Sequence, residues 1–148
     1  MADAMLDVLW KNLEQLESSS RWLGRSYEKC RAIGIKEAYT EDEFDTYENL
    51  TARYARTVDL IINRVLRSVD AAEFLEPGSV IDAANRAEKR GIIESVSRMR
   101  DLKDLRNEIA HEYETDDLQG LFGSVMTLVP EVLALASRIA DYCIRFRT

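Results

Sequence analysis

The 148 residues are 46% hydrophobic and 32% charged, and this size and composition favour one soluble globular domain over residues 1–148. No apolar run approaches the roughly 20 residues that a membrane span needs, and the first residues lack the basic and then apolar pattern of a signal peptide. The net charge of −7 counts against a protein that binds nucleic acid with most of its surface. We therefore expect a cytoplasmic protein that does not contact a membrane.

The cysteines and the histidine argue against a disulfide framework and a zinc site. Cys30 and Cys143 are far apart in the chain without a Cys-x-x-Cys pair, and His111 is the only histidine. A zinc site needs several such ligands close together. We expect no bound metal and no cofactor, and free thiols fit a reducing cytoplasm.

The first predicted element is a long helix over about residues 4–33. Ser18–Ser20 are candidates for a bend, and Gly34 is a plausible stop. We interpret Trp10 and Trp22 as core or interface aromatics rather than as platforms for a ligand. Apolar residues recur at helical spacing along this segment: Met5, Val8, Leu9, Leu13, Leu16, Leu23, Tyr27 and Cys30.

The second predicted helix begins at a capping box, in which Thr40 is the N-cap and Glu43 reaches back to it, and continues to about residue 74. We interpret its acidic start as favourable charge at a helix N-terminus. The alternative is a metal site built from four carboxylates of this run: Glu41, Asp42, Asp45 and Glu48. The outer side of the helix carries four arginines that we interpret mostly as a solvated face: Arg53, Arg56, Arg64 and Arg67.

Turn residues divide the rest of the chain into three further helices. The run Pro77–Asp82 breaks the chain and restarts it as a short helix that ends near Gly91. The next helix is expected over about residues 92–113. A final helix, capped by residues 115–117, continues to the C-terminus, with a kink or restart near Pro130. No segment alternates as a strand does, so we predict an all-α, mostly antiparallel bundle of four to five helices.

The helix over residues 92–113 has two different sides. At about 100° per residue, an apolar side that must face a core adjoins a polar, largely basic side, and Arg106 lies on the border between them. The apolar side consists of Met99, Leu102, Leu105, Ile109 and Tyr113. The polar side consists of Arg100, Lys103, Asn107 and His111. An arginine, an amide and an imidazole along one helix edge form a rigid platform for an anionic group.

The residues around this helix are basic although the chain as a whole is acidic. From Arg86 to Arg106 there are seven basic and four acidic side chains, a local balance of +3. We therefore expect a compact, shielded binding site for RNA on an otherwise acidic protein.

Each of these residues also has an ordinary structural interpretation. A single histidine near a helix C-terminus is usually a partner of the helix dipole or a packed core residue. Arg106 could simply pair with a carboxylate of another helix, Asn107 could cap or bond the backbone, and Tyr113 could be a core aromatic. The functional interpretation depends on their occurring together.

Together, Arg106-Asn107-x-x-x-His111-x-Tyr113, preceded by Leu102-x-x-Leu105, resembles the Arg-polar-x3-His-x-Tyr motif of the HEPN superfamily. HEPN proteins are helical ribonucleases that are common in prokaryotic toxin–antitoxin systems. The pattern is most similar to the HepT branch, whose toxins are paired with a small nucleotidyltransferase antitoxin (MNT). The helical pattern of the whole chain is compatible with this resemblance.

The resemblance implies a metal-independent endoribonuclease toxin with Arg106 and His111 as its catalytic residues. It also implies that the antitoxin transfers AMP to Tyr113, which adds a bulky anion beside the site and blocks RNA entry. Three polar side chains of the same helix would support the catalytic pair: Asn107, Lys103 and Arg100.

RNA cleavage without a metal needs a base for the 2′-OH proton, an acid for the leaving 5′-oxygen and a cation for the charge on phosphate. One chain supplies one imidazole, a group whose ordinary pKa of about 6.5 suits either proton-transfer role but not both at once. A two-fold axis beside the motif would bring two copies of His111 and Arg106 into one cleft. We therefore predict a homodimer with a composite site that forms a 2′,3′-cyclic phosphate and a 5′-hydroxyl. The resemblance likewise implies a dimer with a composite site.

Two other functions stay open. One is a non-catalytic HEPN-type binding partner of a nucleotidyltransferase, although such proteins typically lack the arginine and histidine present here. The other is a plain helical interaction domain with a coincidental motif. Growth arrest on expression that is lost when His111 is changed would favour the nuclease over the binding partner.

Overall fold

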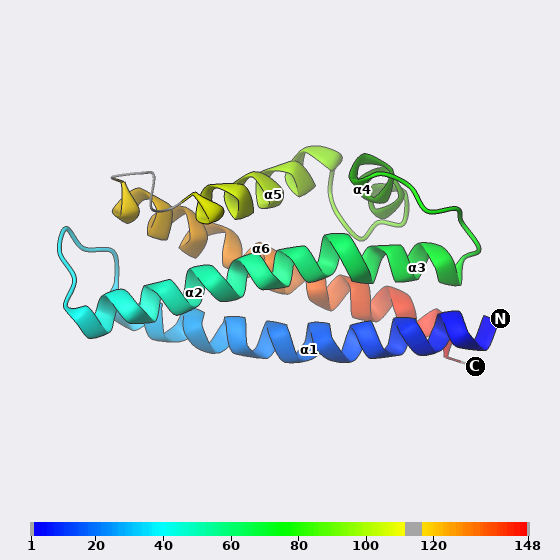
Figure 1. Ribbon diagram of the computed structural model, residues 1–148, viewed down its shortest axis with the longest axis horizontal. Helices are drawn as coiled ribbons and strands as arrows, with labels where there is room; N and C mark the ends of the chain where they lie inside the picture. Colours follow the sequence, from blue (N-terminus) through cyan, green and yellow to red (C-terminus); the bar gives the residue numbers. More distant parts are fainter. Residues whose placement is uncertain (1, 112–116, 148) are drawn as a thin grey trace.

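The computed structural model describes residues 2–111 and 117–147, and within these ranges the chain is helical without β-strands (Figure 1). The long helices are antiparallel: α1 and α5 run in one direction, whereas α2–α3 and α6 run in the other, and α4 lies at the end of the bundle beside α3. This arrangement confirms the predicted all-α bundle. The elements are α1 (Ala2–Ile33), α2 (Glu41–Leu60), the π-helical turn η1 (Ile61–Val65), α3 (Leu66–Ala72), α4 (Val80–Lys89), α5 (Val96–Ala110), α6 (Leu118–Cys143) and the 3-10 turn η3 (Ile144–Phe146).

Local capping residues set the helix boundaries as predicted. The Thr40 hydroxyl accepts a hydrogen bond from the Glu43 N–H at 3.1 Å, and the Glu43 carboxylate accepts one from the Thr40 N–H at 3.0 Å. Ser79 and Asp82 form the same reciprocal pair at the start of α4, and the hydrogen bond from the Ser79 N–H lowers the pKa of Asp82. Gly34 has a φ of 81°, a left-handed conformation that favours glycine and ends α1.

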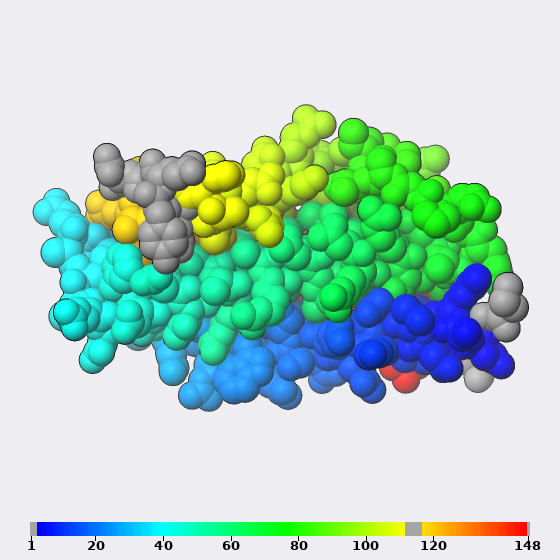
Figure 2. Space-filling model, in the orientation of Figure 1, coloured from blue at the N-terminus to red at the C-terminus, as the bar shows by residue number. Residues whose placement is uncertain are grey.

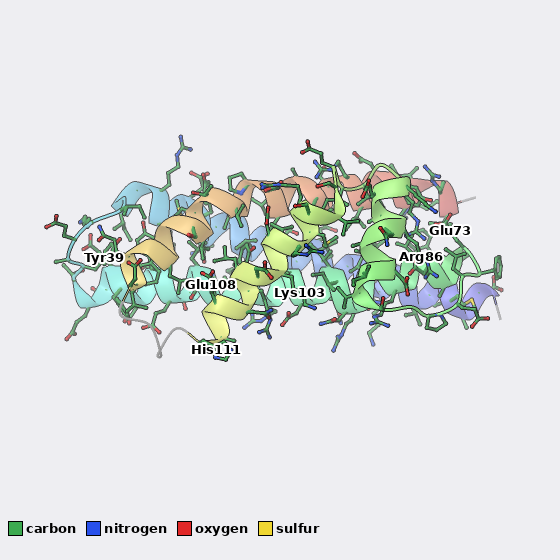
Figure 3. All side chains as sticks on the ribbon, turned by 90° about the horizontal axis from the view of Figure 1, so that it is seen from above. Tyr39, Glu73, Arg86, Lys103, Glu108 and His111 are labelled. Carbon is green, nitrogen blue, oxygen red and sulfur yellow. The ribbon has the colours of Figure 1, made fainter. Side chains whose placement is uncertain are left out.

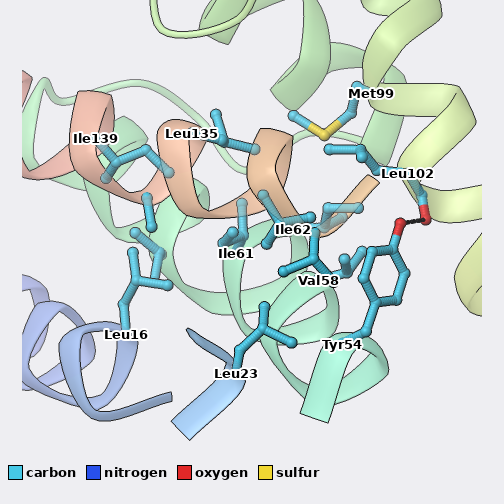
Figure 4. Close-up of a cluster of buried hydrophobic side chains, with 14 of the residues drawn as sticks. Leu16, Leu23, Tyr54, Val58, Ile61, Ile62, Met99, Leu102, Leu135 and Ile139 are labelled. Atoms are coloured by element: carbon cyan, nitrogen blue, oxygen red, sulfur yellow. Dashed lines mark hydrogen bonds between the residues drawn. The ribbon is translucent and has the colours of Figure 1, made fainter. Parts of the chain in front are cut away.

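The apolar sides of the long helices meet in one core. Burial of a leucine, isoleucine or valine side chain contributes about 1.5–3 kcal/mol, so this packing fixes where α5 lies on the bundle. Figure 4 shows part of the core, in which side chains from α1, α2, α5 and α6 come together: Leu16, Leu23, Tyr54, Val58, Met99, Leu102, Leu135 and Ile139.

α6 is a core helix. By length, and by the mean hydropathy of 1.5 of an 18-residue stretch within it, the segment Leu118–Phe146 could cross a membrane. Nine side chains of α6 are nevertheless buried in the bundle, among them Phe122, Val129 and Ile139. Burial against α1, α2 and α5 accounts for the apolar side of this helix.

α5 begins later than predicted. The prediction placed its start near Ile92, but the first helical residue is Val96, and the Ser95 hydroxyl caps the helix by accepting a hydrogen bond from the Arg98 N–H at 3.1 Å. The reason is Gly91, whose φ of 75° turns the chain and leaves a short non-helical link. The apolar side chain of Ile92 is buried all the same, which explains its place in the apolar pattern.

Two further differences concern helix continuity. The helix predicted over residues 41–74 contains the π-helical turn η1, in which the Leu66 N–H bonds to the Ile61 carbonyl. α6 continues through Pro130, so a restart there is wrong, and the predicted kink stays a prediction. Pro130 is exposed, and its ring nitrogen offers no hydrogen to the carbonyl one turn earlier in the helix.

An ionic cluster ties α3, α4 and α6 together. Arg90 donates hydrogen bonds to Asp70 and to Glu73, each at 2.7 Å, Arg86 donates to Asp70 at 2.9 Å, and the Tyr142 hydroxyl donates to Glu73 at 3.0 Å. The side chains of Asp70 and Arg90 are only 5% and 7% exposed. Burial by itself lowers the pKa of Arg90, but the hydrogen bonds and charges of Asp70 and Glu73 outweigh it and raise that pKa.

Candidate functional site

α5 buries one side and exposes the other, as predicted. Met99, Leu102, Leu105 and Ile109 are buried in the core. The four polar residues predicted on the other side, which we name the polar edge of α5, are exposed except for the half-buried Lys103: Arg100, Lys103, Asn107 and His111. Figure 3 shows His111 projecting at the C-terminal end of α5, whereas Glu108 lies on the side of α5 that faces α6.

Polar contacts to two neighbouring helices fix the position of α5. The Tyr54 hydroxyl of α2 donates to the Leu102 carbonyl at 2.9 Å within the core (Figure 4), and burial raises the pKa of that hydroxyl. Arg98 forms a two-point ion pair with Glu131 of α6, with 2.8 Å between Nε and Oε1. Both contacts lie before the motif on the same continuous helix, so they hold the backbone that carries the motif residues in place.

Arg106 is held by Asp59 of α2. Its Nε donates to Oδ1 at 2.7 Å and its Nη2 donates to Oδ2 at 2.9 Å, a two-point pairing that orients the guanidinium plane. These hydrogen bonds raise the pKa of Arg106 above its ordinary value. The Arg106 side chain remains 32% exposed, so a ligand from solvent can reach the guanidinium.

Asp59 is a residue of the site that the sequence analysis missed. It lies 47 positions before Arg106, and no local spacing connects the two residues. The ordinary interpretation of Arg106, pairing with a carboxylate of another helix, therefore describes its geometry correctly. The same pairing holds the cation in one place at the border of the polar edge, which is what a binding site for an anion requires.

His111 is the C-cap residue of α5. Its backbone leaves the helical conformation, with φ −109° and ψ 21°, and its N–H donates to the Glu108 carbonyl at 3.0 Å. Asn107 lies one turn earlier on the same side. Arg106 precedes His111 by five residues, about 7.5 Å along the helix axis and about 140° around it.

The basic surplus predicted around the motif is divided between distant parts of the molecule. Arg86 and Arg90 belong to the ionic cluster, and Figure 3 shows Arg86 far along the bundle from His111. Arg98 is paired with Glu131. The site on α5 is therefore less basic than the sequence predicts.

Two further predictions concern Tyr113 and a bound metal ion. Tyr113 lies outside the described residues, so its role stays a prediction. Within residues 2–111 and 117–147, no group of three or more His, Cys, Asp or Glu side chains is arranged to hold a metal ion, and the alternative metal site at the start of α2 is not found.

The fold and the polar edge of α5 define a class of protein: an all-α bundle with an Arg-x4-His motif on an exposed helix. A model of the Ribonuclease HepT-like family matches residues 11–139, and the chain belongs to this family. The assignment confirms the resemblance to the HEPN superfamily and its HepT branch. Comparisons with curated proteins and with solved structures give no match.

Proposed function

We propose that this protein is a metal-independent endoribonuclease toxin that cuts RNA at Arg106 and His111 and is neutralised by an MNT-type nucleotidyltransferase antitoxin. One observation carries the proposal: in a chain of the Ribonuclease HepT-like family, both residues occupy solvent-accessible positions on one rigidly held helix. A HEPN-type protein that only binds a partner has no need of this pair. The cytoplasm, which contains both RNA and the antitoxin, is the proposed location.

The proposed reaction is an internal transfer at phosphorus. One His111 takes the proton of the 2′-OH, the 2′-oxygen attacks phosphorus, and the bond to the 5′-oxygen breaks while His111 of the second protomer protonates it. The products are a 2′,3′-cyclic phosphate and a 5′-hydroxyl. Arg106 offsets the charge that builds up on the phosphate oxygens. Asn107 orients the imidazole or the phosphate, and two further cations extend the binding surface along α5: Lys103 and Arg100.

A homodimer is the expected assembly. The chain has one histidine, whereas the reaction needs two proton-transfer groups, and two polar edges related by a two-fold axis supply both. Sedimentation velocity under assay conditions should therefore give a dimer. A fully active monomer would contradict the composite site.

The modification of Tyr113 should control toxicity. Expression of the protein should arrest growth, Arg106→Ala should abolish the arrest, and co-expressed nucleotidyltransferase should relieve it by adding AMP to Tyr113. Each AMP adds a phosphate that competes with RNA for Arg106 within the same molecule. Tyr113→Phe removes the acceptor oxygen, so this variant should stay toxic beside the active nucleotidyltransferase.

Intact mass after co-expression measures this modification. The wild-type protein should gain the mass of one or more AMP groups, and Tyr113→Phe should gain none. AMP on a different residue, or neutralisation without any AMP, would contradict the role of Tyr113. Growth arrest that survives Arg106→Ala would contradict the proposal that toxicity comes from RNA cleavage at this site.

Asp59 should hold Arg106 in its catalytic position, and its negative charge should at the same time weaken the binding of RNA. Asp59→Asn keeps the size of the side chain but removes its charge. We expect kcat to fall about 10-fold, because a slightly misplaced catalytic group can cost up to about 100-fold. KM should also fall, by about 2- to 5-fold, because a half-buried carboxylate beside the site no longer repels phosphate. Asp104→Asn, which removes an exposed carboxylate of α5, should change neither constant appreciably.

Steady-state kinetics on one RNA substrate separate the two effects. An unchanged kcat in Asp59→Asn would show that Asp59 has no positioning role. A similar fall in kcat for Asp104→Asn would show that the effect comes from the overall charge.

A further inference from the structure

A groove lies between α1 and α2 beside the Arg106–Asp59 pair. Its volume is about 870 Å³, and Asp59 forms part of its wall. α2 (cyan to green in Figure 2) separates α1 (blue) from α5 (yellow) on the face shown. The groove is thus connected to the α5 site through Asp59, which contributes to both.

The α2 wall of the groove is cationic. Arg53 and Arg56 of α2 and Arg64 of η1 line it, and the one acidic residue among the described residues of the lining, Asp59, is bonded to Arg106. Arg56 and Arg64 are exposed, and neither forms an ion pair with a residue in the described part of the chain. Three arginines gathered in one groove, on a protein of net charge −7, favour a polyanion as the ligand.

Trp22 forms an exposed aromatic surface on the α1 wall. Trp22 is 45% exposed, so it is not a core aromatic, and the other half of the prediction, an interface aromatic, stays a prediction. The guanidinium carbon of Arg53 lies 5.1 Å from the ring centroid and that of Arg25 lies 5.6 Å from it. Arg53 is fixed by hydrogen bonds to the Trp22 carbonyl at 3.3 Å and to the Ser26 hydroxyl at 2.6 Å. The exposed Arg25 can therefore give way to a flat ligand while Arg53 stays in place.

This combination selects single-stranded nucleic acid among polyanions. An unpaired base stacks on an exposed indole, and the phosphates on either side bind arginine. A duplex hides its bases, and an acidic peptide would satisfy the arginines but leave the ring without a flat partner. A π-helical turn, which often occurs at functional sites, adds Asn63 and Arg64 to the same wall, and both are exposed.

We propose that the groove binds single-stranded RNA next to the bond that is cut, with a base stacked on Trp22 and phosphates held by Arg56 and Arg64. The identity of the nucleic acid rests on the proposed function. In this arrangement Trp22, Arg56 and Arg64 determine affinity, whereas Arg106 and His111 act on the phosphate that reacts.

Tryptophan fluorescence tests the stacking, because the chain has only two tryptophans. Trp10→Phe leaves Trp22 as the only reporter, and Trp22→Phe leaves Trp10, which lies in α1 outside the groove, as the matched control. The probe is a single-stranded RNA of about a dozen nucleotides, within the ~4–16 nucleotide site sizes of single-strand binders. Its 2′-oxygens are methylated, so that it cannot form a cyclic phosphate.

The RNA should quench the fluorescence of the Trp10→Phe protein and leave that of the Trp22→Phe protein unchanged. Trp22→Ala should weaken binding by about 5- to 160-fold, the usual contribution of stacking one base. Because Trp22 is exposed, these variants should keep the helical circular dichroism of the wild type. Equal quenching of both reporters, or unchanged affinity of Trp22→Ala, would overturn the proposal.

Salt dependence tests the phosphate contacts. Arg56→Gln and Arg64→Gln should each reduce the slope of log affinity against log salt by about 0.7, the value for one phosphate of a single strand. Arg67→Gln, an exposed residue of α3 outside the lining, should not change the slope. Equal slopes for the three variants, or equally tight binding of a duplex of the same sequence, would overturn the proposal.

Cleavage of unmodified RNA separates this proposal from the proposed function. Arg56→Gln and Arg64→Gln should raise KM for a long single-stranded RNA by about the factor by which they weaken binding of the methylated RNA, whereas Arg67→Gln, outside the lining, should leave KM unchanged. An equal rise in KM for Arg67→Gln would overturn the groove as the binding surface. Cleavage by His111→Ala would overturn the catalytic role of His111 in the proposed function, while the binding results above would still test whether the groove binds RNA.

Discussion

Changing His111 to alanine should lower the single-turnover rate of RNA cleavage by at least about 100-fold, because a positioned proton-transfer group contributes about 10²- to 10⁴-fold. In a symmetric dimer the substitution removes both the base and the acid. His111 is exposed at the C-cap of α5, so the loss should not come from unfolding. The measurement is the cleavage rate of end-labelled RNA with the protein in excess.

Glu108→Gln is the matched control for this substitution. Glu108 is exposed on the last turn of the same helix but lies on the side that faces α6 (Figure 3). The Glu108→Gln protein should cleave RNA at nearly the wild-type rate. Persistent cleavage by purified His111→Ala, or an equal loss in Glu108→Gln, would contradict the role of His111.

Changing Arg90 to methionine should destabilise the protein by about 3 kcal/mol, at the lower end of the cost of breaking a buried ion pair. The substitution leaves Asp70 buried with Arg86 as its one remaining cation in the ionic cluster, and leaves Glu73 with Tyr142. For a chain of this length the unfolding midpoint should fall by about 6–12 °C. Urea and thermal unfolding followed by circular dichroism measure both quantities.

Arg67→Met is the control for this prediction, because Arg67 is exposed and lies near the same end of the bundle in α3. Its free energy of unfolding should stay within about 0.5 kcal/mol of the wild type. Equal destabilisation by the two variants would show that Arg90 contributes no more than a surface arginine does.

The helix boundaries that depend on neighbouring residues could be predicted from the sequence. Thr40 and Ser79 form their capping hydrogen bonds within three residues, and the buried side of α5 follows from helical spacing alone. Pro130 suggested a restart of α6 that the structure does not show. Whether a helix continues through a proline depends on how its neighbours pack, which a local pattern does not contain.

The residues of the polar edge of α5 could also be predicted from the sequence, but the residues of other helices that lie near it could not. The Arg106–Asp59 pair joins α5 to α2 across 47 positions, and the exposure of Trp22 depends on how α1 packs against α2. The local charge balance was misleading for a similar reason. Arg86 and Arg90 are close to the motif in the chain but fold into the ionic cluster elsewhere in the bundle.

The end groups of the cleaved RNA test the central claim most directly. Purified wild-type protein, treated with a chelator, should cut single-stranded RNA and leave a 2′,3′-cyclic phosphate on one fragment and a 5′-hydroxyl on the other. These ends follow from proton transfer by His111 with Arg106 stabilising the phosphate charge. Fragments with a 5′-phosphate, or cleavage that stops when the chelator is added, would contradict the account.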